Sequence, residues 1–236
     1  MYTDLIIKNN IIFIKQQIND IAHRYRRNPK QISFIAVSKN QSINTINNAI
    51  SAGQKHFGEN YIQEGVKKIL WCNKHILHQK LIWHFIGSIQ SNKVKFIAQY
   101  FDWCHTLHTA RIASYLNKHR PEILTPLNIL IQINISHSNN KSGILPNQLL
   151  NLVEQIIIYP KLKLRGLMAI PEIENNYKQQ LKIFTKMFKL FQQLKNNHPT
   201  VDTLSIGMSN DMEAAIAAGG NLLRIGTAIF GNRLKN

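Results

Sequence analysis

The chain has little cysteine: only Cys72 and Cys104 occur among its 236 residues, and they form no CxxC pair. A disulfide framework or a zinc site is therefore not indicated, and a reducing compartment is the simplest interpretation. The sequence also lacks an uninterrupted apolar run of about 18 residues, so no membrane-spanning helix is predicted. Lys8, Lys15 and Asp20 interrupt the N-terminal apolar segment, so no signal peptide is expected. We expect a cytoplasmic protein without a membrane partner.

Acidic residues are also scarce. Only 12 Asp and Glu residues stand against 29 Lys and Arg residues, which gives a formal charge of +17. Such a charge ordinarily indicates nucleic acid or an anionic membrane as a partner. However, the chain holds 36 Ile, 26 Asn and 21 Lys residues, all with AT-rich codons, which favours mutational drift as the source of the lysines. We expect no specific nucleic-acid complex, only weak and salt-sensitive binding to polyanions. Most lysines are expected at solvated helix or loop positions, such as Lys67, Lys68, Lys161, Lys178, Lys182 and Lys189.

No Pro/Gly-rich joint, low-complexity linker or long charge block divides the chain. Short apolar runs instead alternate with longer amphipathic segments, as buried parallel strands alternate with helices. The predicted strands are 32–37, 55–58, 81–86, 102–107, 127–135, 162–168, 203–207 and 221–225. The predicted helices between them are 42–52, 61–71, 91–99, 110–118, 146–157, 177–196 and 211–218.

Capping signals fit this alternation. Ser42, Thr109 and Asn210 are good N-caps, and Gly53 and Gly219 follow two helices as left-handed C-caps do. Eight strands, each followed by a helix, predict an α/β protein with the (β/α)₈ TIM-barrel fold. We expect one domain over residues 1–236, with a barrel over about 32–232 and an extra amphipathic helix at about 5–25.

The functional site of such a barrel lies at the carboxyl ends of its strands. Lys39 directly follows the first predicted strand, where partial desolvation disfavours the ammonium form of a lysine. A neutral lysine amine is a nucleophile that can form a Schiff base. The alternative is a lysine that only reaches solvent over the loop. The same rule selects Ser38, Glu59, Asn60, His84, Met168, residues 207–210 and residues 224–227.

The last two predicted strands end in residues that suit a phosphate. Ser209 can cap the helix that begins near Asp211, and Gly226 with Thr227 offers an accessible backbone and a hydroxyl. Ordinary capping and a glycine-rich loop are the alternative. Together with Lys39, this arrangement suggests pyridoxal 5′-phosphate or a phosphorylated carbonyl substrate. Arg224 needs an acceptor, which is either an aromatic ring nitrogen or a carboxylate such as Glu59 or Asp211.

Other chemistry finds little support. There is no GxxxxGK[ST] phosphate loop, no GxSxG elbow and no HExxH motif. His75 and His78 have no third ligand nearby, so no metal site is expected. His84 in a strand is by default a barrel-lining side chain, and Cys104 is expected to be a packed, inert thiol.

Five motifs in this order form a specific signature: AVSK, FGENY, RGLMAI, GMSNDMEAAI and RIGTAIFG. With IAVSKNQS at 35–42 and WHFIGSIQSNK at 83–93, the matching stretches extend over almost the whole chain after the first helix. The chain resembles the bacterial pyridoxal phosphate homeostasis proteins of the YggS/PROSC-like family. This resemblance implies a fold type III barrel that binds pyridoxal phosphate (PLP), like the N-terminal domain of alanine racemase.

The resemblance also implies roles for individual residues. Lys39 matches the lysine that holds PLP as a covalent imine, and Arg224 matches the residue that faces the pyridine nitrogen. Ser209, Gly226 and Thr227 match phosphate-binding residues. Asn60, His84 and Met208 complete the implied cofactor-binding set.

Two functions remain open for such a site. PLP stabilises carbanions best with a protonated ring nitrogen, which a charged arginine disfavours, and the second domain that supplies an acid/base group in racemases is not expected here. We therefore expect a monomeric, non-enzymatic protein that buffers PLP inside the cell and hands it transiently to apo-enzymes. The alternative is a small PLP-dependent amino-acid racemase or decarboxylase.

Overall fold

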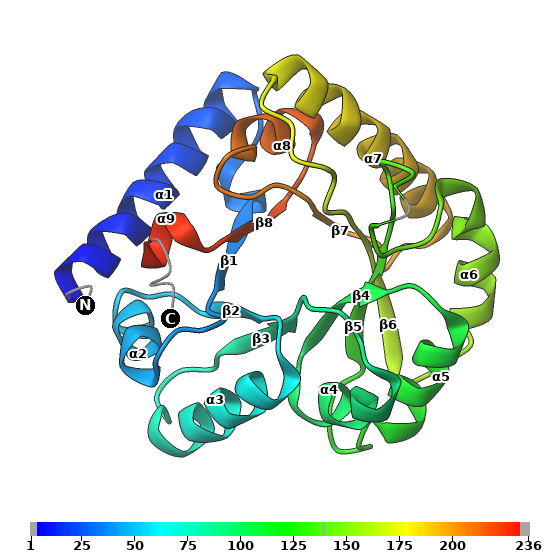
Figure 1. The fold of residues 1–236 in the computed structure, drawn as a ribbon, viewed down its shortest axis with the longest axis horizontal. Coiled ribbons are helices and arrows are strands. Elements are labelled where there is room, and N and C mark those ends of the chain that lie inside the picture. The colour runs from blue at the N-terminus through cyan, green and yellow to red at the C-terminus, as the bar shows by residue number, and fades with distance from the viewer. Residues whose placement is uncertain (1–3, 139, 232–236) are drawn as a thin grey trace.

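The computed structural model describes residues 4–138 and 140–231, and in it eight parallel strands close into a barrel in chain order. Figure 1 shows the strands in the centre, surrounded by a ring of helices. The predicted (β/α)₈ fold is confirmed, although its predicted end at residue 232 lies outside the described residues. The strands are β1 (Ser33–Val37), β2 (His56–Glu59), β3 (Ile82–Phe85), β4 (Trp103–Leu107), β5 (Leu127–Gln132), β6 (Leu162–Met168), β7 (Thr203–Ser205) and β8 (Leu222–Ile225).

The helices follow the strands as predicted. Short 3₁₀ turns at Ser91–Lys93 and Pro146–Gln148 begin two of the segments that were predicted as continuous helices. The helices are α1 (Asp4–Arg24), α2 (Ile43–Ser51), α3 (Ile62–His75), α4 (Val94–Tyr100), α5 (Ala110–His119), α6 (Leu149–Ile156), α7 (Tyr177–Asn197), α8 (Met212–Ala218) and α9 (Thr227–Phe230).

Helix α1 covers the seam where the first and last strands meet. Its buried side chains Ile7, Ile11, Ile14, Ile18 and Ile21 recur every three or four residues, which places them on one face of the helix. This face packs against α2, α8 and α9, and β1 pairs with β8 beneath it (Figure 1). The predicted N-terminal helix is therefore confirmed and closes the barrel from outside.

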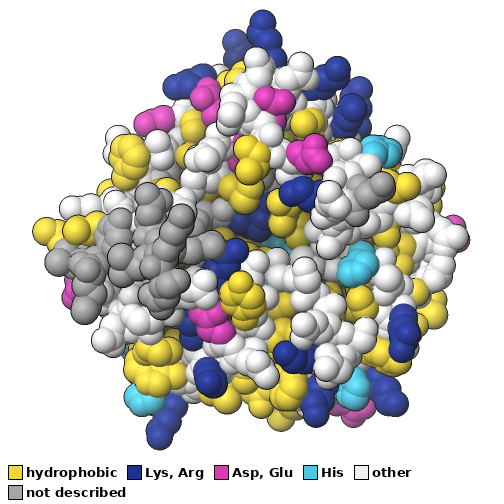
Figure 2. All heavy atoms as spheres, in the orientation of Figure 1, with side chains coloured by type: hydrophobic (Ala, Val, Ile, Leu, Met, Phe, Trp, Pro, Cys, Tyr) yellow, Lys and Arg dark blue, Asp and Glu magenta, His cyan; other side chains and the backbone are white. Residues whose placement is uncertain are grey.

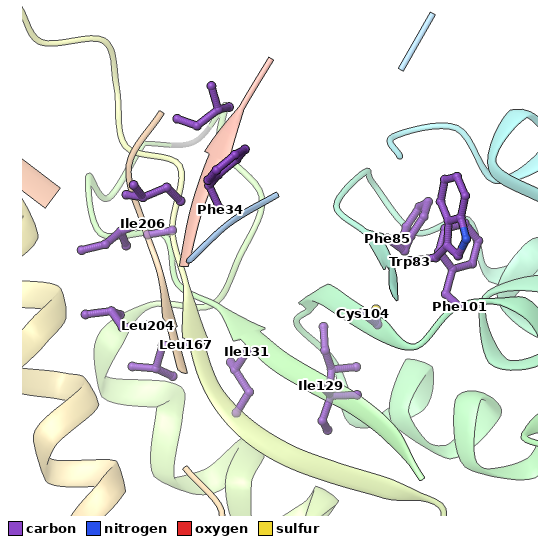
Figure 3. Close-up of a cluster of buried hydrophobic side chains, with 14 of the residues drawn as sticks. Phe34, Trp83, Phe85, Phe101, Cys104, Ile129, Ile131, Leu167, Leu204 and Ile206 are labelled. Carbon is purple, nitrogen blue, oxygen red and sulfur yellow. The ribbon is translucent and has the colours of Figure 1, made fainter. Parts of the chain in front are cut away.

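The main apolar core lies between the strands and the surrounding helices. Figure 3 shows part of it, with Phe34, Trp83, Phe85 and Ile131 among the labelled side chains. Cys104 belongs to the same cluster, and burial raises the pKa of its thiol to about 11. Cys104 is thus a packed, inert thiol, as predicted.

Most capping predictions are confirmed. The Ser42 and Thr109 hydroxyls accept hydrogen bonds from the N–H groups of Thr45 and Ile112. Gly219 ends α8 in the left-handed region with φ of +113°. The prediction for Asn210 is wrong, because Asp211 occupies the N-cap position of α8. No helix within residues 4–138 and 140–231 has the length and apolar character needed to span a membrane.

Candidate functional site

A cavity of about 320 Å³ opens at the carboxyl ends of the strands. Residues that follow β1, β2, β3, β6, β7 and β8 line it, as the strand-end rule predicts. Figure 2 shows the barrel face of Figure 1 hollowed near its centre, with Lys or Arg side chains bordering the hollow. The predicted site residues in the cavity lining are Lys39, Asn60, Met208, Ser209, Arg224, Gly226 and Thr227.

Lys39 is half-buried in a tight turn that follows β1. The turn closes with a hydrogen bond from Gln41 N to Ser38 O, and Asn40 adopts a left-handed conformation with φ of +60°. Two side chains from α3 hold the backbone on both sides of Lys39. Lys68 Nζ donates to Ser38 O at 2.6 Å, and Asn40 N donates to Glu64 Oε1 at 2.7 Å. These two hydrogen bonds, which we call the clamp, fix the backbone on both sides of Lys39 and so set the direction in which its side chain leaves the turn.

The clamp belongs to a buried ionic cluster of Ser38, Glu59, Glu64 and Lys68, which we call the Lys68 cluster. Lys68 Nζ lies 2.8 Å from Glu59 Oε1 and 2.5 Å from Glu64 Oε1, and Ser38 Oγ donates to Glu59 Oε1 at 2.6 Å. Glu59 is 0% exposed and Lys68 4% exposed. Burial raises the pKa of the Glu59 carboxyl, although Lys68 and Ser38 act against this shift. The expectation that Lys68 is solvated is therefore wrong.

Asn60 follows β2 and lines the cavity. Its Oδ1 atom is buried and has no hydrogen-bond partner among the described residues, so a polar ligand group would satisfy it. The neighbouring backbone is tightly packed, because a Cβ atom on Gly87 would lie 2.0 Å from Asn60 O. Gly87 thus fixes the Asn60 loop by close backbone approach.

Replacing Gly87 with alanine should lower the free energy of unfolding by about 1–3 kcal/mol, because the new methyl group has to displace backbone rather than a flexible side chain. Urea denaturation measures this. The control is Gly226→Ala, whose Cβ would meet Val37 at an ordinary 3.5 Å and should cost less than about 1 kcal/mol. Equal losses in the two variants would contradict the tight packing of the Asn60 loop.

Arg224 lies on β8 and is 4% exposed. Its Nη1 donates to Ser205 O and Ser205 Oγ, both at 2.7 Å, and its Nη2 donates to Ala169 O at 2.8 Å. Burial lowers the pKa of the guanidinium to about 10, and Asp211 partly offsets this shift. The alternative of an ion pair with Glu59 or Asp211 is wrong, since neither pairs with Arg224 in the part of the chain that the structure describes. A guanidinium has five N–H donors, so Arg224 can donate further to a ligand.

The segment after β7 is shaped by Asp211. Met208 N donates to Asp211 Oδ1 at 2.5 Å, and Gly207 adopts a positive φ of +90°. Burial raises the pKa of the Asp211 carboxyl against the opposing effects of the Met208 N–H and Arg224. The expected capping of α8 by Ser209 is wrong, because Asp211 precedes this helix. Ser209 lines the cavity instead, which leaves its predicted contact with a phosphate as a hypothesis.

The segment after β6 forms a cavity wall that was not among the predicted site residues. Ile170, Pro171, Glu172, Ile173 and Glu174 all line the cavity. The available signal was their place directly after a predicted strand, where the strand-end rule applies equally. The wall adds two carboxylates and an apolar surface to the mouth.

His84 does not line this cavity, contrary to what the resemblance implies, and is instead the barrel-lining side chain that its place in a strand predicts. Ile86, two residues further along the chain, does line it, and residues two apart on a strand point to the same side. His84 therefore lies one layer deeper, where it is 0% exposed and contacts His56 and His105 at 2.9 Å. No group of three or more His, Cys, Asp or Glu side chains within the described ranges is arranged to hold a metal ion.

Comparisons with known proteins agree with this geometry. Residues 14–233 match the family model described as alanine racemase, N-terminal domain. The pyridoxal phosphate homeostasis protein of Escherichia coli strain K12 is 50% identical over 227 residues, which are 96% of this chain and 97% of the relative. The chain belongs to the pyridoxal phosphate homeostasis protein family. The resemblance inferred from its motifs is thereby confirmed.

Solved structures share the barrel. PipY of Synechococcus elongatus PCC7942, whose structure has PLP bound, is similar with a TM-score of 0.81 and 28% identity, covering 95% of this chain and 100% of PipY. Alanine racemase of Clostridium difficile in complex with cycloserine gives a TM-score of 0.72 at 12% identity, covering 97% of this chain and 61% of the racemase. The second match shows a common fold. Within the homeostasis family, this chain thus presents its strand-end cavity on a racemase-type barrel.

Proposed function

We propose that this chain binds PLP in the cavity at the carboxyl ends of its strands and serves intracellular PLP homeostasis by buffering and delivering the cofactor. The observation that carries the proposal is the placement of Lys39 and Arg224 in one cavity of about 320 Å³, together with the Ser209 and Thr227 hydroxyls. A family relationship at 50% identity to a pyridoxal phosphate homeostasis protein supports it.

The residues present fit the cofactor. PLP carries an aldehyde, an aromatic ring with a nitrogen acceptor, and a phosphate. A half-buried lysine, a buried arginine with spare donors and two hydroxyls complement these groups. Asn60, another residue of the cavity lining, has a buried Oδ1 acceptor without a partner among the described residues. When bound, PLP supplies an electrophilic aldehyde and a ring that withdraws electrons.

Each residue then has a definite task. Lys39 would hold the cofactor through an imine between its Nζ and the aldehyde, with release of water, and the hydrogen bonds at Ser38 O and Asn40 N fix the backbone from which this side chain extends. Arg224 would donate to the ring nitrogen, while its hydrogen bonds to Ser205 and Ala169 fix the guanidinium. Ser209, Gly226 and Thr227 hold the phosphate, where each hydrogen bond to the charged group contributes about 1.5–3 kcal/mol.

The proposal is one of binding without strong catalysis. Arg224 remains cationic near neutral pH, since its pKa is lowered only to about 10. A cation that donates to the ring nitrogen keeps this nitrogen unprotonated, which weakens the ring as an electron sink. We also propose that the protein acts as a monomer and passes PLP to apo-enzymes in transient contacts.

The second candidate is a small PLP-dependent racemase or decarboxylase. Glu172 and Glu174 favour it, because these residues line the same cavity as Lys39 and carry carboxylates, which can exchange protons with a substrate. Deuterium exchange at the α-carbon of a panel of amino acids distinguishes the two functions. Exchange at turnover rates would establish the enzyme and overturn the carrier.

The experiment that tests the proposal is addition of PLP to the cofactor-free protein. We expect a visible absorbance band, loss of this band on borohydride reduction, and a reduced PLP adduct on the peptide that contains Lys39. Mass spectrometry of the digested protein locates the adduct. Absence of both uptake and adduct would overturn the proposed function.

A further inference from the structure

A chain of hydrogen bonds crosses the interior of the barrel. His56 Nδ1 lies 2.9 Å from His84 Nε2, and His84 Nδ1 lies 2.9 Å from His105 Nε2. His105 Nδ1 lies 3.2 Å from Ser205 Oγ, which accepts a hydrogen bond from Arg224. Because β4 and β7 are not neighbours in the barrel, the contact between His105 and Ser205 spans its interior. We call His56, His84, His105 and Ser205 the histidine relay.

The relay joins two cavities at opposite ends of the barrel. Arg224 lines the cofactor cavity at the carboxyl ends of the strands. His56 and His84 both line a second cavity, of about 760 Å³, formed by residues at the amino ends of the strands together with residues of α7 and α8. His84, His105 and Ser205 between them are 0% exposed. Solvent at the second cavity therefore meets the relay at the His56 end, where the half-buried His56 lies over the fully buried His84, while His105 and Ser205 are shielded.

The surroundings of His56 determine its charge. Burial lowers the pKa of His56, Lys55 lowers it further, and Asp102 acts in the opposite direction. The other charged side chains that line the second cavity are mostly cationic, and cations oppose the protonation of His56. The one carboxylate among them is paired with Arg165. They are Arg27, Arg165, Lys195 and Asp202.

The inner rings are neutral. Burial holds the pKa of His84 and of His105 well below the ordinary histidine range. A neutral imidazole carries one N–H, so a row of such rings donates in one direction only. In the outward arrangement, Ser205 donates to His105, and each ring donates from Nε2 towards His56. In the inward arrangement, each ring donates from Nδ1 towards Ser205.

Protonation of His56 selects the inward arrangement. A His56 ring that takes one proton from solvent carries N–H on both nitrogens, so its Nδ1 must donate to His84. His84 and His105 each keep one proton, now on Nδ1 instead of Nε2. Ser205 keeps its hydroxyl proton but turns it away from His105, and its Oγ then accepts from both His105 and Arg224. The only net change is the single proton gained by His56.

We propose that the histidine relay couples protonation of His56 at one end of the barrel to the hydrogen bonds of Arg224 in the cofactor cavity at the other end. His105 and Ser205 are thus positioning residues for Arg224. The consequence for PLP rests on the proposed function. In the outward arrangement Ser205 Oγ accepts from Arg224 while it donates to His105, and hydrogen bonds in such a chain strengthen each other. In the inward arrangement the same atom accepts from both partners, so its hydrogen bond from Arg224 is weaker, Arg224 is held less firmly, and PLP is bound more weakly. A weakening equivalent to part of one hydrogen bond corresponds to about a two- to tenfold weaker Kd.

The relay itself is tested on the cofactor-free protein. Long-range ¹H–¹⁵N spectra of histidine rings, with the Arg224 side-chain ¹⁵N signals, are followed between about pH 5 and pH 8. We expect His84 and His105 to change tautomer, and Arg224 to shift, with the midpoint of His56. In His56→Gln the inner rings should keep one tautomer throughout. In the control His23→Gln, which changes an exposed residue on α1, the transition should remain. Inner tautomers or Arg224 signals that stay constant while His56 titrates would overturn the proposal.

The effect on the cofactor is tested separately by the pH dependence of the PLP Kd. We expect the Kd to rise about two- to tenfold as the wild-type His56 gains its proton, and this step to be absent in His56→Gln. A step of the same size in both proteins would overturn the coupling to PLP. A protein that takes up no PLP at any pH would refute the proposed function instead, and the spectra of the cofactor-free protein would still decide the relay.

Discussion

Replacing Lys68 with methionine is expected to lower the free energy of unfolding by about 3–5 kcal/mol. The variant leaves Glu59, which is 0% exposed, without its cation, and it removes the hydrogen bond to Ser38 O. Urea denaturation at neutral pH measures the loss. The matched control is Lys67→Met, one residue earlier on α3, whose side chain is exposed and should cost less than about 0.5 kcal/mol. Equal stability of the two variants would contradict a structural role for the Lys68 cluster.

The pH dependence of the Lys68→Met variant identifies the cause. Without Lys68, the pKa of Glu59 rises further in the folded state, because Lys68 opposes the effect of burial. A carboxyl whose pKa is higher in the folded than in the unfolded state destabilises the fold as the pH rises through that interval. The deficit relative to wild type should therefore shrink in mild acid. The double variant with Glu59→Gln should recover part of the loss at neutral pH, since no buried charge remains.

Replacing Lys39 with alanine is expected to abolish covalent attachment of PLP. No other residue of the cavity lining carries a primary amine in the described part of the chain, so no imine can replace the one at Lys39. The fold should persist, because the clamp acts on the Ser38 and Asn40 backbone rather than on the Lys39 side chain. The visible band and the mass of the borohydride-reduced protein measure the loss.

The control for Lys39→Ala is Lys74→Ala, which removes an exposed lysine from α3 and should leave attachment at the wild-type level. Denaturation curves of both variants should match that of the wild type within about 1 kcal/mol. A full equivalent of reduced PLP adduct on Lys39→Ala would show that a different lysine holds the cofactor.

The sequence was sufficient to predict the barrel and the cavity-lining residues after β1, β2, β7 and β8 for a simple reason. Strand and helix periodicities differ, and residues that follow parallel strands gather at one end of the barrel. Lys39, Asn60 and Arg224 could be placed by this rule alone. The wall after β6 obeys the same rule, but its residues carry no distinctive nucleophile or cation that would have singled them out.

The errors have physical causes that local patterns do not reveal. Lys68 follows Glu64 by four residues, a spacing typical of a solvated helix pair, and its buried partner Glu59 lies on a neighbouring strand. His84 was assigned to the cavity by the resemblance and the strand-end rule, whereas its position inside β3 makes it the barrel-lining side chain that the strand pattern predicts. The partners of Arg224 lie on β7 and after β6, and such contacts depend on the three-dimensional closure of the barrel.

The pairing of β1 with β8 has a consequence for the order of events during synthesis. Ser33 aligns with Leu222 and Ala36 with Ile225, so the edge of β1 has no final partner until almost the entire chain has left the ribosome. The apolar face of α1 packs against α8 and α9, so it also remains without these partners until the end of synthesis. Because Lys39 follows β1 while Gly226 and Thr227 follow β8, the cavity forms only when the two ends of the chain meet. A small molecule that contacts Lys39 and also Gly226 and Thr227 would therefore bind only the closed barrel, and its binding free energy would add to the stability of that closed form.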